Sequence, residues 1–235
     1  MNELSHPQSA LPFTVPPRDY FVKKMTELGI GDGHWTVVYD QGTVQGGSIA
    51  VSYWASRLAW QMQYEGYDHV AILLGGLFKW KAEGRPVTAL PGKYEPAIFT
   101  GQRRSELLAT KEEVKKAMQD EHVILINSLS PEDYKGESNA YARKGHIPSS
   151  ANVFFAEHAD KHTKIMHDDA TLRKQFEQTG ALDVDKKVIT YCGGGLAATW
   201  TALILNKLGQ KNVAVYDGSL NEWASDPTCP LLVEN

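Results

Sequence analysis

Residues 188–198, VITYCGGGLAA, decide the fold class, because they run from a short apolar segment through three glycines into a second apolar segment. Residues 188–191 predict a buried strand and residues 196–208 predict a helix. In an open parallel sheet, a loop between a strand and the next helix lies at the carboxyl end of the strand, where such sheets bind ligands. The stretch therefore predicts an α/β protein with a site at this loop.

The rest of the chain alternates short apolar strands with helices in the same way. Strands are expected at residues 36–39, 69–73, 123–126 and 213–216, and helices at residues 18–28, 49–65, 111–119, 171–179 and 219–223. Alternation of this kind produces parallel pairing with helices that flank the sheet.

Two parts of the chain look like copies of each other. Residues 36–40 (TVVYD) correspond to residues 188–192 (VITYC), and residues 72–80 (ILLGGLFKW) correspond to residues 215–223 (VYDGSLNEW). The correspondence places Asp40 of the first copy where the second copy has a cysteine. One copy therefore has a thiol at this position and the other does not.

The repeat and the prolines between the copies predict the domain organisation. Three prolines and a glycine interrupt any periodicity in residues 86–99, which indicates a linker. We expect a partial, non-catalytic unit at residues 1–90, a linker at residues 91–104, and a complete catalytic domain at residues 105–235.

The cysteine loop has the composition of an anion site. Three glycines let the backbone curl with its N–H groups inward, and the helix that follows adds its positive N-terminal end. We predict that Cys192 is the nucleophile and that substrate binds to loop amides. The amides in question belong to Gly193, Gly194, Gly195, Leu196 and Ala197.

This setting favours a thiolate, because helix N-termini and nearby donors lower cysteine pKa values from about 8.5 to as little as about 3.5–7.5. A thiolate can attack the outer sulfur of a sulfane donor, and loop amides can stabilise the leaving anion and then the persulfide. The plain alternative is a cysteine buried for packing. Three following glycines argue against it, since each costs backbone entropy on folding.

Composition bounds the other classes of function. The chain has 235 residues, 42% hydrophobic and 22% charged, with a formal net charge of −4 and no basic run, so a nucleic acid partner is not expected. We see no leader-like start and no apolar stretch of roughly 18 residues, and two cysteines do not make a disulfide framework. We expect a soluble, cytoplasmic protein that does not bind membranes. Motifs such as CxxC, HExxH and GxxxxGK[ST] do not occur, so we expect no metal and no organic cofactor.

The second copy resembles the tandem-domain rhodanese family of thiosulfate and 3-mercaptopyruvate sulfurtransferases. The matching residues are GHIP at 145–148 with ANV at 151–153, YC and its glycine loop at 191–195, and YDGS at 216–219 with Trp223. The first copy resembles the family's non-catalytic N-terminal domain, including Tyr-Asp in place of Tyr-Cys.

The resemblance implies a fold and a reaction. The fold would be a rhodanese-like parallel sheet flanked by helices, in two related units of which the first is partial and the second complete. The reaction would move a sulfane sulfur from a small anionic donor, thiosulfate or 3-mercaptopyruvate, to cyanide or a thiol through a persulfide on Cys192.

Two departures from the family concern the catalytic copy. Asn127-Ser128-Leu129 stands where the family usually has Asp-x-Arg, so an ion-pairing arginine is missing. The loop CGGGLA resembles neither the basic loop of thiosulfate enzymes nor the CGSGVT loop of mercaptopyruvate enzymes. Positive charge must come from amides, the helix end or side chains elsewhere, and both donors stay open.

A third departure concerns the first copy. A complete N-terminal unit would have another strand and a GHIP-like segment before anything seen here, so residues 1–90 resemble its second half. We expect such a half-domain to leave apolar strand edges uncovered. The chain would then be poorly stable or would associate with another subunit, as in a homo-oligomer.

Further residues are candidates for binding substrate or tuning the site. Arg143 could reach the anion, or could be a solvated charge beside Lys144. His146 could act as an acid or base, although fixing the turn by hydrogen bonding is the favoured role. Asp217 and Ser219 are expected to order the loop after the last strand and so to tune the cysteine loop.

The sequence also bears on two alternatives to an enzyme that turns over sulfur. A cysteine phosphatase needs Cys-x5-Arg to clamp phosphate, and Ala198 occupies the position of that arginine. A non-catalytic persulfide carrier or binding module belongs to a different class, and turnover separates it from an enzyme. Cys229, in a tail without glycines or a helix, is expected to be structural.

Overall fold

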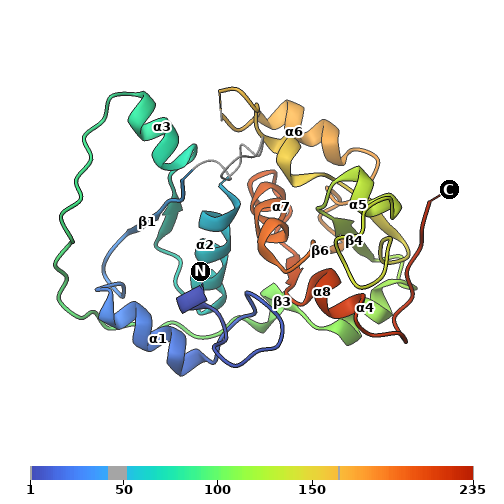
Figure 1. Cartoon of the computed structure of the whole chain (residues 1–235), viewed down its shortest axis with the longest axis horizontal. Coiled ribbons are helices and arrows are strands. Elements are labelled where there is room, and N and C mark those ends of the chain that lie inside the picture. The colour runs from blue at the N-terminus through green and yellow to red at the C-terminus, as the bar shows by residue number, and fades with distance from the viewer. Residues whose placement is uncertain (1, 42–51, 164, 235) are drawn as a thin grey trace.

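The structure is a computed structural model that describes residues 2–41, 52–163 and 165–234. Within them, two parallel sheets lie side by side with helices around them (Figure 1). We call the part built on the two-stranded sheet the first unit and the part built on the five-stranded sheet the second unit. The first unit contains α1 (Arg18–Glu27), β1 (Thr36–Val38), α2 (Tyr53–Tyr64), β2 (Val70–Ile72) and α3 (Gly76–Ala82), after a short 3-10 helix at Asn2–Leu4.

The second unit has a parallel sheet with the strand order β3-β7-β6-β4-β5. Its strands are β3 (Leu108–Ala109), β4 (Val123–Asn127), β5 (Ser150–Asn152), β6 (Lys187–Tyr191) and β7 (Val213–Tyr216). Its helices are α4 (Lys111–Ala117), α5 (Pro131–Lys135), α6 (Asp169–Phe176), α7 (Leu196–Lys207) and α8 (Ser219–Trp223), with 3-10 turns at Ser105–Leu107 and Phe155–His158.

Strand β6 is buried on both faces, as its continuous apolar sequence predicts for a central parallel strand. Alternate residues face opposite layers. Val188 belongs to the core beneath α6 and α7, which includes Trp200. Ile189 belongs to the core beneath α4 and α8, which includes Trp223. The predicted α/β architecture with flanking helices is therefore confirmed.

The two units meet where α2 packs against α7 (Figure 1). The hydroxyls of Ser56 and Thr199 lie 3.0 Å apart in this buried contact. Trp60 stacks on Tyr64 with ring centroids 5.5 Å apart, and both belong to the main core of the second unit. The aromatic helix of the first unit thus completes the core of the second.

The internal repeat is visible in matching backbone hydrogen bonds. Leu77 N donates to Asp40 O at 2.8 Å in the first unit, and Leu220 N donates to Cys192 O at 3.0 Å in the second. One residue farther along each loop, Phe78 N donates to Gln41 O and Asn221 N donates to Gly193 O, at 3.1 and 2.9 Å. These pairs occur in the register that the sequence predicted.

The segment expected to be a linker packs against the first unit. Phe99 lies in the small core that also contains Phe21 and Tyr67. Arg104 Nη1 donates to Asp68 Oδ1 at 2.7 Å. The limits of the domains stay a prediction.

The first unit also exposes an apolar surface. Trp35, Val37 and Tyr39, at alternate positions within and directly beside β1, are more than half exposed. The expectations of uncovered strand edges and of association with another subunit both stay predictions. None of the helices in the described parts of the chain combines the length and apolarity needed to cross a membrane.

Element boundaries shift by a few residues from those expected. Helix α2 begins at Tyr53, and the expected earlier start at residues 49–51 lies outside the described residues. Strands β3 and β5 were not expected from the sequence, because they have only two and three residues, and β5 also lacks an apolar pattern.

Candidate active site

Cys192 follows β6 directly, at the carboxyl end of the central strand of the larger sheet. Its side chain is 2% exposed and borders the core beneath α7. Gly195, with φ +74°, is the N-cap of α7, a helix of 12 residues. The strand and the helix therefore fix both ends of the cysteine loop, which we define as residues 192–195.

Three carbonyls of the cysteine loop are held by hydrogen bonds. Those of Cys192 and Gly193 accept from backbone amides of α8, at 3.0 and 2.9 Å. That of Gly195 accepts from Arg57 Nη1 at 3.2 Å. In a trans peptide the carbonyl and the next N–H point in opposite directions, so these bonds turn the N–H groups of Gly193, Gly194 and Leu196 away from α8 and Arg57.

The amides of Gly193 and Gly194 have no hydrogen-bond partner within the described residues. They follow the cysteine and precede a helix N-terminus, so they can receive an anion next to the thiol. The loop thus has the geometry of the predicted anion nest, and substrate binding by these amides stays a prediction.

The Ser219 hydroxyl holds two amides of the cysteine loop by hydrogen bonds. Its Oγ accepts from the amides of Cys192 and Gly195 at 3.0 and 3.2 Å, and donates to the Tyr216 carbonyl at 2.7 Å. The ordering role expected for Ser219 agrees with these bonds. The amide of Gly195, expected to bind substrate with its neighbours, is instead directed at Ser219.

Asp217 orders the same region through a buried ion pair. Its Oδ1 accepts from Arg57 Nη1 at 2.6 Å, and its Oδ2 accepts from Val15 N at 2.8 Å. Both carboxylate oxygens are thus bonded to parts of the chain outside the second unit. The sequence gave no local signal for either partner, because they lie 160 and 202 residues away.

Two tyrosines flank the cysteine, and the sequence reasoning missed both as site residues. A Cβ at Gly193 would collide with the Tyr141 hydroxyl, so this phenol lies against the loop. Burial first, and the proximity of negative charge at Cys192 second, raise the pKa of Tyr141 well above the ordinary value of 10.0. Burial also raises the pKa of Tyr53, with a smaller contribution from Cys192. Both phenols therefore stay protonated at neutral pH and can donate hydrogen bonds.

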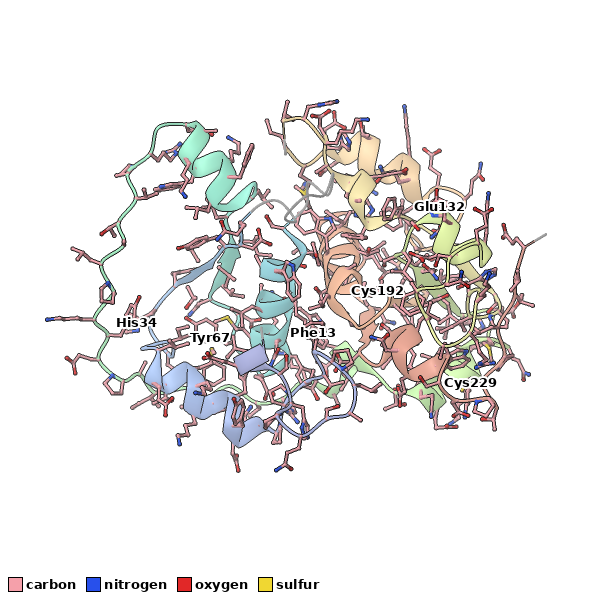
Figure 2. All side chains as sticks on the ribbon, in the orientation of Figure 1. Phe13, His34, Tyr67, Glu132, Cys192 and Cys229 are labelled. Carbon is pink, nitrogen blue, oxygen red and sulfur yellow. The ribbon has the colours of Figure 1, made fainter. Side chains whose placement is uncertain are left out.

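The N-terminal lead-in covers one side of the loop. Phe13 has a left-handed backbone, with φ +63°, and its ring packs edge-on against Trp54 at 5.3 Å. Its ring carbon would lie 4.0 Å from a Cβ at Gly194. Figure 2 shows Phe13 on the side of α2 that faces Cys192. A segment expected to be irregular thus forms part of the wall of the site.

Arg143 and His146 are engaged by the protein itself. The Arg143 guanidinium donates to four backbone carbonyls at 2.6–3.1 Å, two of them at Asp226 and Cys229 in the C-terminal tail. His146 is buried, with Nδ1 2.8 Å from the Tyr134 carbonyl and its ring stacked on Tyr134 at 3.7 Å. These contacts favour roles in fixing the tail and the turn, and binding of substrate by either side chain stays a prediction.

Known proteins with similar sequences carry sulfurtransferase names. The rhodanese-like domain family matches residues 110–226. Thiosulfate sulfurtransferase of Rattus norvegicus is 33% identical over 219 residues, which cover 89% of this chain and 69% of the relative. The chain belongs to the rhodanese family of sulfurtransferases. Thiosulfate/3-mercaptopyruvate sulfurtransferase 1, mitochondrial, of Arabidopsis thaliana is 29% identical, covering 98% of this chain and 65% of the relative.

Solved structures confirm the rhodanese fold. The 3-mercaptopyruvate sulfotransferase SseA from Escherichia coli has a TM-score of 0.78 and 27% identity, covering 92% of this chain and 78% of that chain. The anaerobic ergothioneine biosynthesis enzyme from Chlorobium limicola has a TM-score of 0.83 and covers 100% of this chain and 58% of that chain. At 24% identity, this second likeness shows the fold alone.

A neutral hydrogen-bond network occupies the position of the family's Asp-x-Arg element. Asn127 is fully buried, its Nδ2 donates to Tyr191 Oη at 3.1 Å, and its Oδ1 accepts from Leu129 N at 2.8 Å. Tyr191 Oη also lies 2.7 Å from Ser150 Oγ. Uncharged groups therefore join β4, β5 and β6 at the segment where the sequence already indicated that the ion-pairing arginine is missing.

Proposed function

We propose that this chain is a sulfurtransferase that takes a sulfane sulfur from thiosulfate or 3-mercaptopyruvate and passes it to cyanide or a thiol. The observation that carries the proposal is the placement of Cys192 at the N-terminus of a 12-residue helix, beside two loop amides that have no hydrogen-bond partner in the described part of the chain. Such a site stabilises both a thiolate and a small anion. It needs no cofactor for the transfer.

The proposed sulfur transfer takes place in two displacement steps, the first on the donor and the second on the persulfide. The Cys192 thiolate attacks the outer sulfur of thiosulfate, the S–S bond breaks, and sulfite leaves with the electron pair. With 3-mercaptopyruvate the C–S bond breaks instead, and pyruvate leaves after its carbon takes a proton. Cyanide or a thiolate then attacks the outer sulfur of the persulfide, and the Cys192 thiolate is released.

Hydrogen-bond donors supply the stabilisation in this scheme. The amides of Gly193 and Gly194 would hold the leaving anion and afterwards the charged outer sulfur, as an oxyanion hole does. The phenol of Tyr141, kept protonated by burial, adds a neutral donor at the same loop. Because the nearby Arg57 charge is paired with Asp217, the site offers dipoles rather than a net cation.

A relative supports the persulfide step. A structure of the ergothioneine enzyme EanB, 25% identical with a TM-score of 0.84, carries a persulfide on a cysteine. The same kind of adduct is proposed for Cys192. The two cysteines of our chain are both free and buried, which suits the reducing, cytoplasmic compartment that we propose for it.

Thiocyanate formation from each donor and cyanide tests the proposal. We expect turnover with at least one donor, loss of turnover in Cys192→Ser, and retained turnover in Cys229→Ser, since Cys229 lies in the core beneath α8. Loading of Cys192 without turnover would favour the persulfide carrier. If mass spectrometry finds no added sulfur on Cys192 with either donor, both the enzyme and the carrier are excluded.

A further inference from the structure

Arg57 belongs to α2 of the first unit, yet its guanidinium reaches the cysteine loop of the second. The side chain is fully buried. Nη1 donates to Gly195 O at 3.2 Å and to Asp217 Oδ1 at 2.6 Å, and Nη2 donates to Phe13 O at 2.7 Å. The guanidinium also lies over the Trp60 ring, 5.0 Å from its centroid. A buried charge is stable when it is paired and hydrogen-bonded, and here its acceptors join three distant parts of the chain.

The hydrogen bond from Arg57 to the Gly195 carbonyl sets the direction of one amide of the proposed anion site. Arg57 holds the carbonyl of the last loop peptide, and the N–H of that same peptide belongs to Leu196, the first residue of α7. The two groups point in opposite directions across a trans peptide. The first N–H groups of a helix lack partners within the helix and are the ones that bind anions. The arginine thus controls where Leu196 N–H is aimed.

The Arg57–Asp217 ion pair orients the cysteine loop and adds little net charge to it. The ion pair is 2.6 Å long, with side chains 0% and 12% exposed, so the two charges largely cancel near the loop. A planar guanidinium serves acceptors in different directions from two separate nitrogens, which a lysine ammonium cannot do. The geometry is therefore specific to arginine.

We propose that Arg57 is a positioning residue for sulfur transfer at Cys192, an inference that rests on the proposed function. It fixes the Gly195–Leu196 peptide so that Leu196 N–H joins the anion site, and it does so without touching the substrate. The first unit has no thiol of its own at the matching position, Asp40, yet it completes the active site of the second unit.

Three variants of the 235-residue chain test the positioning role. Arg57→Gln removes the charge and the two-nitrogen geometry, and Arg57→Lys retains the charge alone. Ser56→Ala is the matched control, because Ser56 is the neighbouring residue of α2 and its hydroxyl contacts Tyr53 and Thr199 without a hydrogen bond to residues 192–195. Each variant is assayed for thiocyanate formation and for the rate of Cys192 alkylation by iodoacetamide across pH, with circular dichroism as the check of folding.

We expect Arg57→Gln to lower kcat and the alkylation rate at neutral pH by about tenfold or more, with a smaller change in KM, because a misdirected donor should cost less than the roughly 100- to 1000-fold loss that follows removal of an oxyanion-hole donor. The alkylation profile should move to higher pH, Arg57→Lys should be intermediate, and Ser56→Ala should match the unmodified chain. If Arg57→Gln does not fold, the alkylation profile of Arg57→Lys decides the question.

The inference is overturned if the folded Arg57 variant alkylates and turns over like the unmodified chain. It is also overturned if Ser56→Ala loses as much as Arg57→Gln at equal stability, because the effect would then be general packing. Failure of the proposed function looks different. In that case the unmodified chain gains no sulfur from either donor, while the alkylation profile still separates Arg57→Gln from Ser56→Ala.

Discussion

The two units hold the residue after the strand by equivalent backbone hydrogen bonds and place different side chains at that position. Asp40 O and Cys192 O each accept from the leucine amide at the equivalent position, Leu77 and Leu220, at 2.8 and 3.0 Å. In the first unit, however, the carboxylate of Asp40 accepts from Ala55 N, in the first turn of α2, at 3.2 Å. The framework is therefore shared, and the side chain after the strand differs.

This difference gives a physical reason why reactivity is proposed for the second unit and not for the first. In the first unit the protein's own carboxylate occupies the helix N-terminus, a position that favours negative charge. In the second unit Cys192 is short and the amides of Gly193 and Gly194 have no partner within the described residues. In the first unit the carboxylate of Asp40 is the anion at the helix N-terminus. In the second unit we propose that the anion of a substrate takes that place.

Making the second unit like the first should have the largest effect. In Cys192→Asp the new carboxylate can bond to the helix N-terminus as Asp40 does, and the nucleophile is gone. We expect sulfur transfer to fall to background, more than about a thousandfold, while the fold is kept. Thiocyanate assays and circular dichroism measure the two outcomes. Residual turnover above a no-protein blank would show that Cys192 is not the nucleophile.

The packing around the loop predicts a large loss of stability in Gly195→Ala. Gly195 has φ +74°, and a Cβ there would lie 2.7 Å from both the carbonyl and Oδ1 of Asp217 and 3.0 Å from Arg57. We expect a loss of about 2–4 kcal/mol in the free energy of unfolding, from strained backbone and overpacking together.

Gly209→Ala is the control that separates these two causes. Gly209 also has positive φ, +107°, but a Cβ there would meet nothing within 4 Å. Its substitution should cost about 1 kcal/mol, the backbone part alone. Urea unfolding measures both variants, and equal losses would show that crowding at the cysteine loop contributes nothing.

Tyr141→Phe should have a smaller effect, confined to the reaction. The variant removes one neutral donor beside Gly193 and leaves the ring in place. We expect kcat to fall about tenfold, equivalent to about 1.4 kcal/mol in the transition state, with little change in stability. Tyr53→Phe removes the phenol on the first-unit side and serves as the comparison. If neither variant changes kcat, the phenols only pack against the site.

The sequence allowed the fold and the position of Cys192 at the end of a central strand to be predicted because both depend on local pattern, while its role as nucleophile stays a prediction. Apolar strands and the glycine loop gave β6, α7 and Cys192, and β7 and α8 fall at the expected residues. The repeat located Asp40 in the correct hydrogen-bond register.

The supporting groups could not be predicted, because tertiary contacts bring them to the loop. Arg57 lies 138 residues from Gly195, and nothing local distinguishes it from a solvated arginine except its apolar helix. Phe13 lies in a proline-rich lead-in without periodicity. Tyr141 precedes the recognised GHIP segment in a stretch that has no helix or strand.

The last and smallest prediction concerns acid stability of the second unit. His158 is fully buried beside Phe176, and within the described residues neither ring nitrogen has a hydrogen-bond partner. Burial, with a smaller effect of His167, lowers the pKa of His158 from 6.5 to about 3. Since the unfolded chain binds this proton below pH 6.5 and the folded chain does not, the free energy of unfolding falls as the pH drops from 6.5 toward 3. At pH 5.5 the loss from this group is about 1 kcal/mol.

His158→Leu removes that proton uptake and fills the same apolar space, so unfolding by urea should depend less on pH between 6.5 and 5.5. Hydrogen exchange would place the acid-sensitive opening in the second unit, around α6, and not in α1 of the first unit. An unchanged pH dependence in His158→Leu would assign the acid sensitivity to carboxylates instead. The two units would then not differ in acid stability, but they would still differ in having Asp40 or Cys192 after the strand.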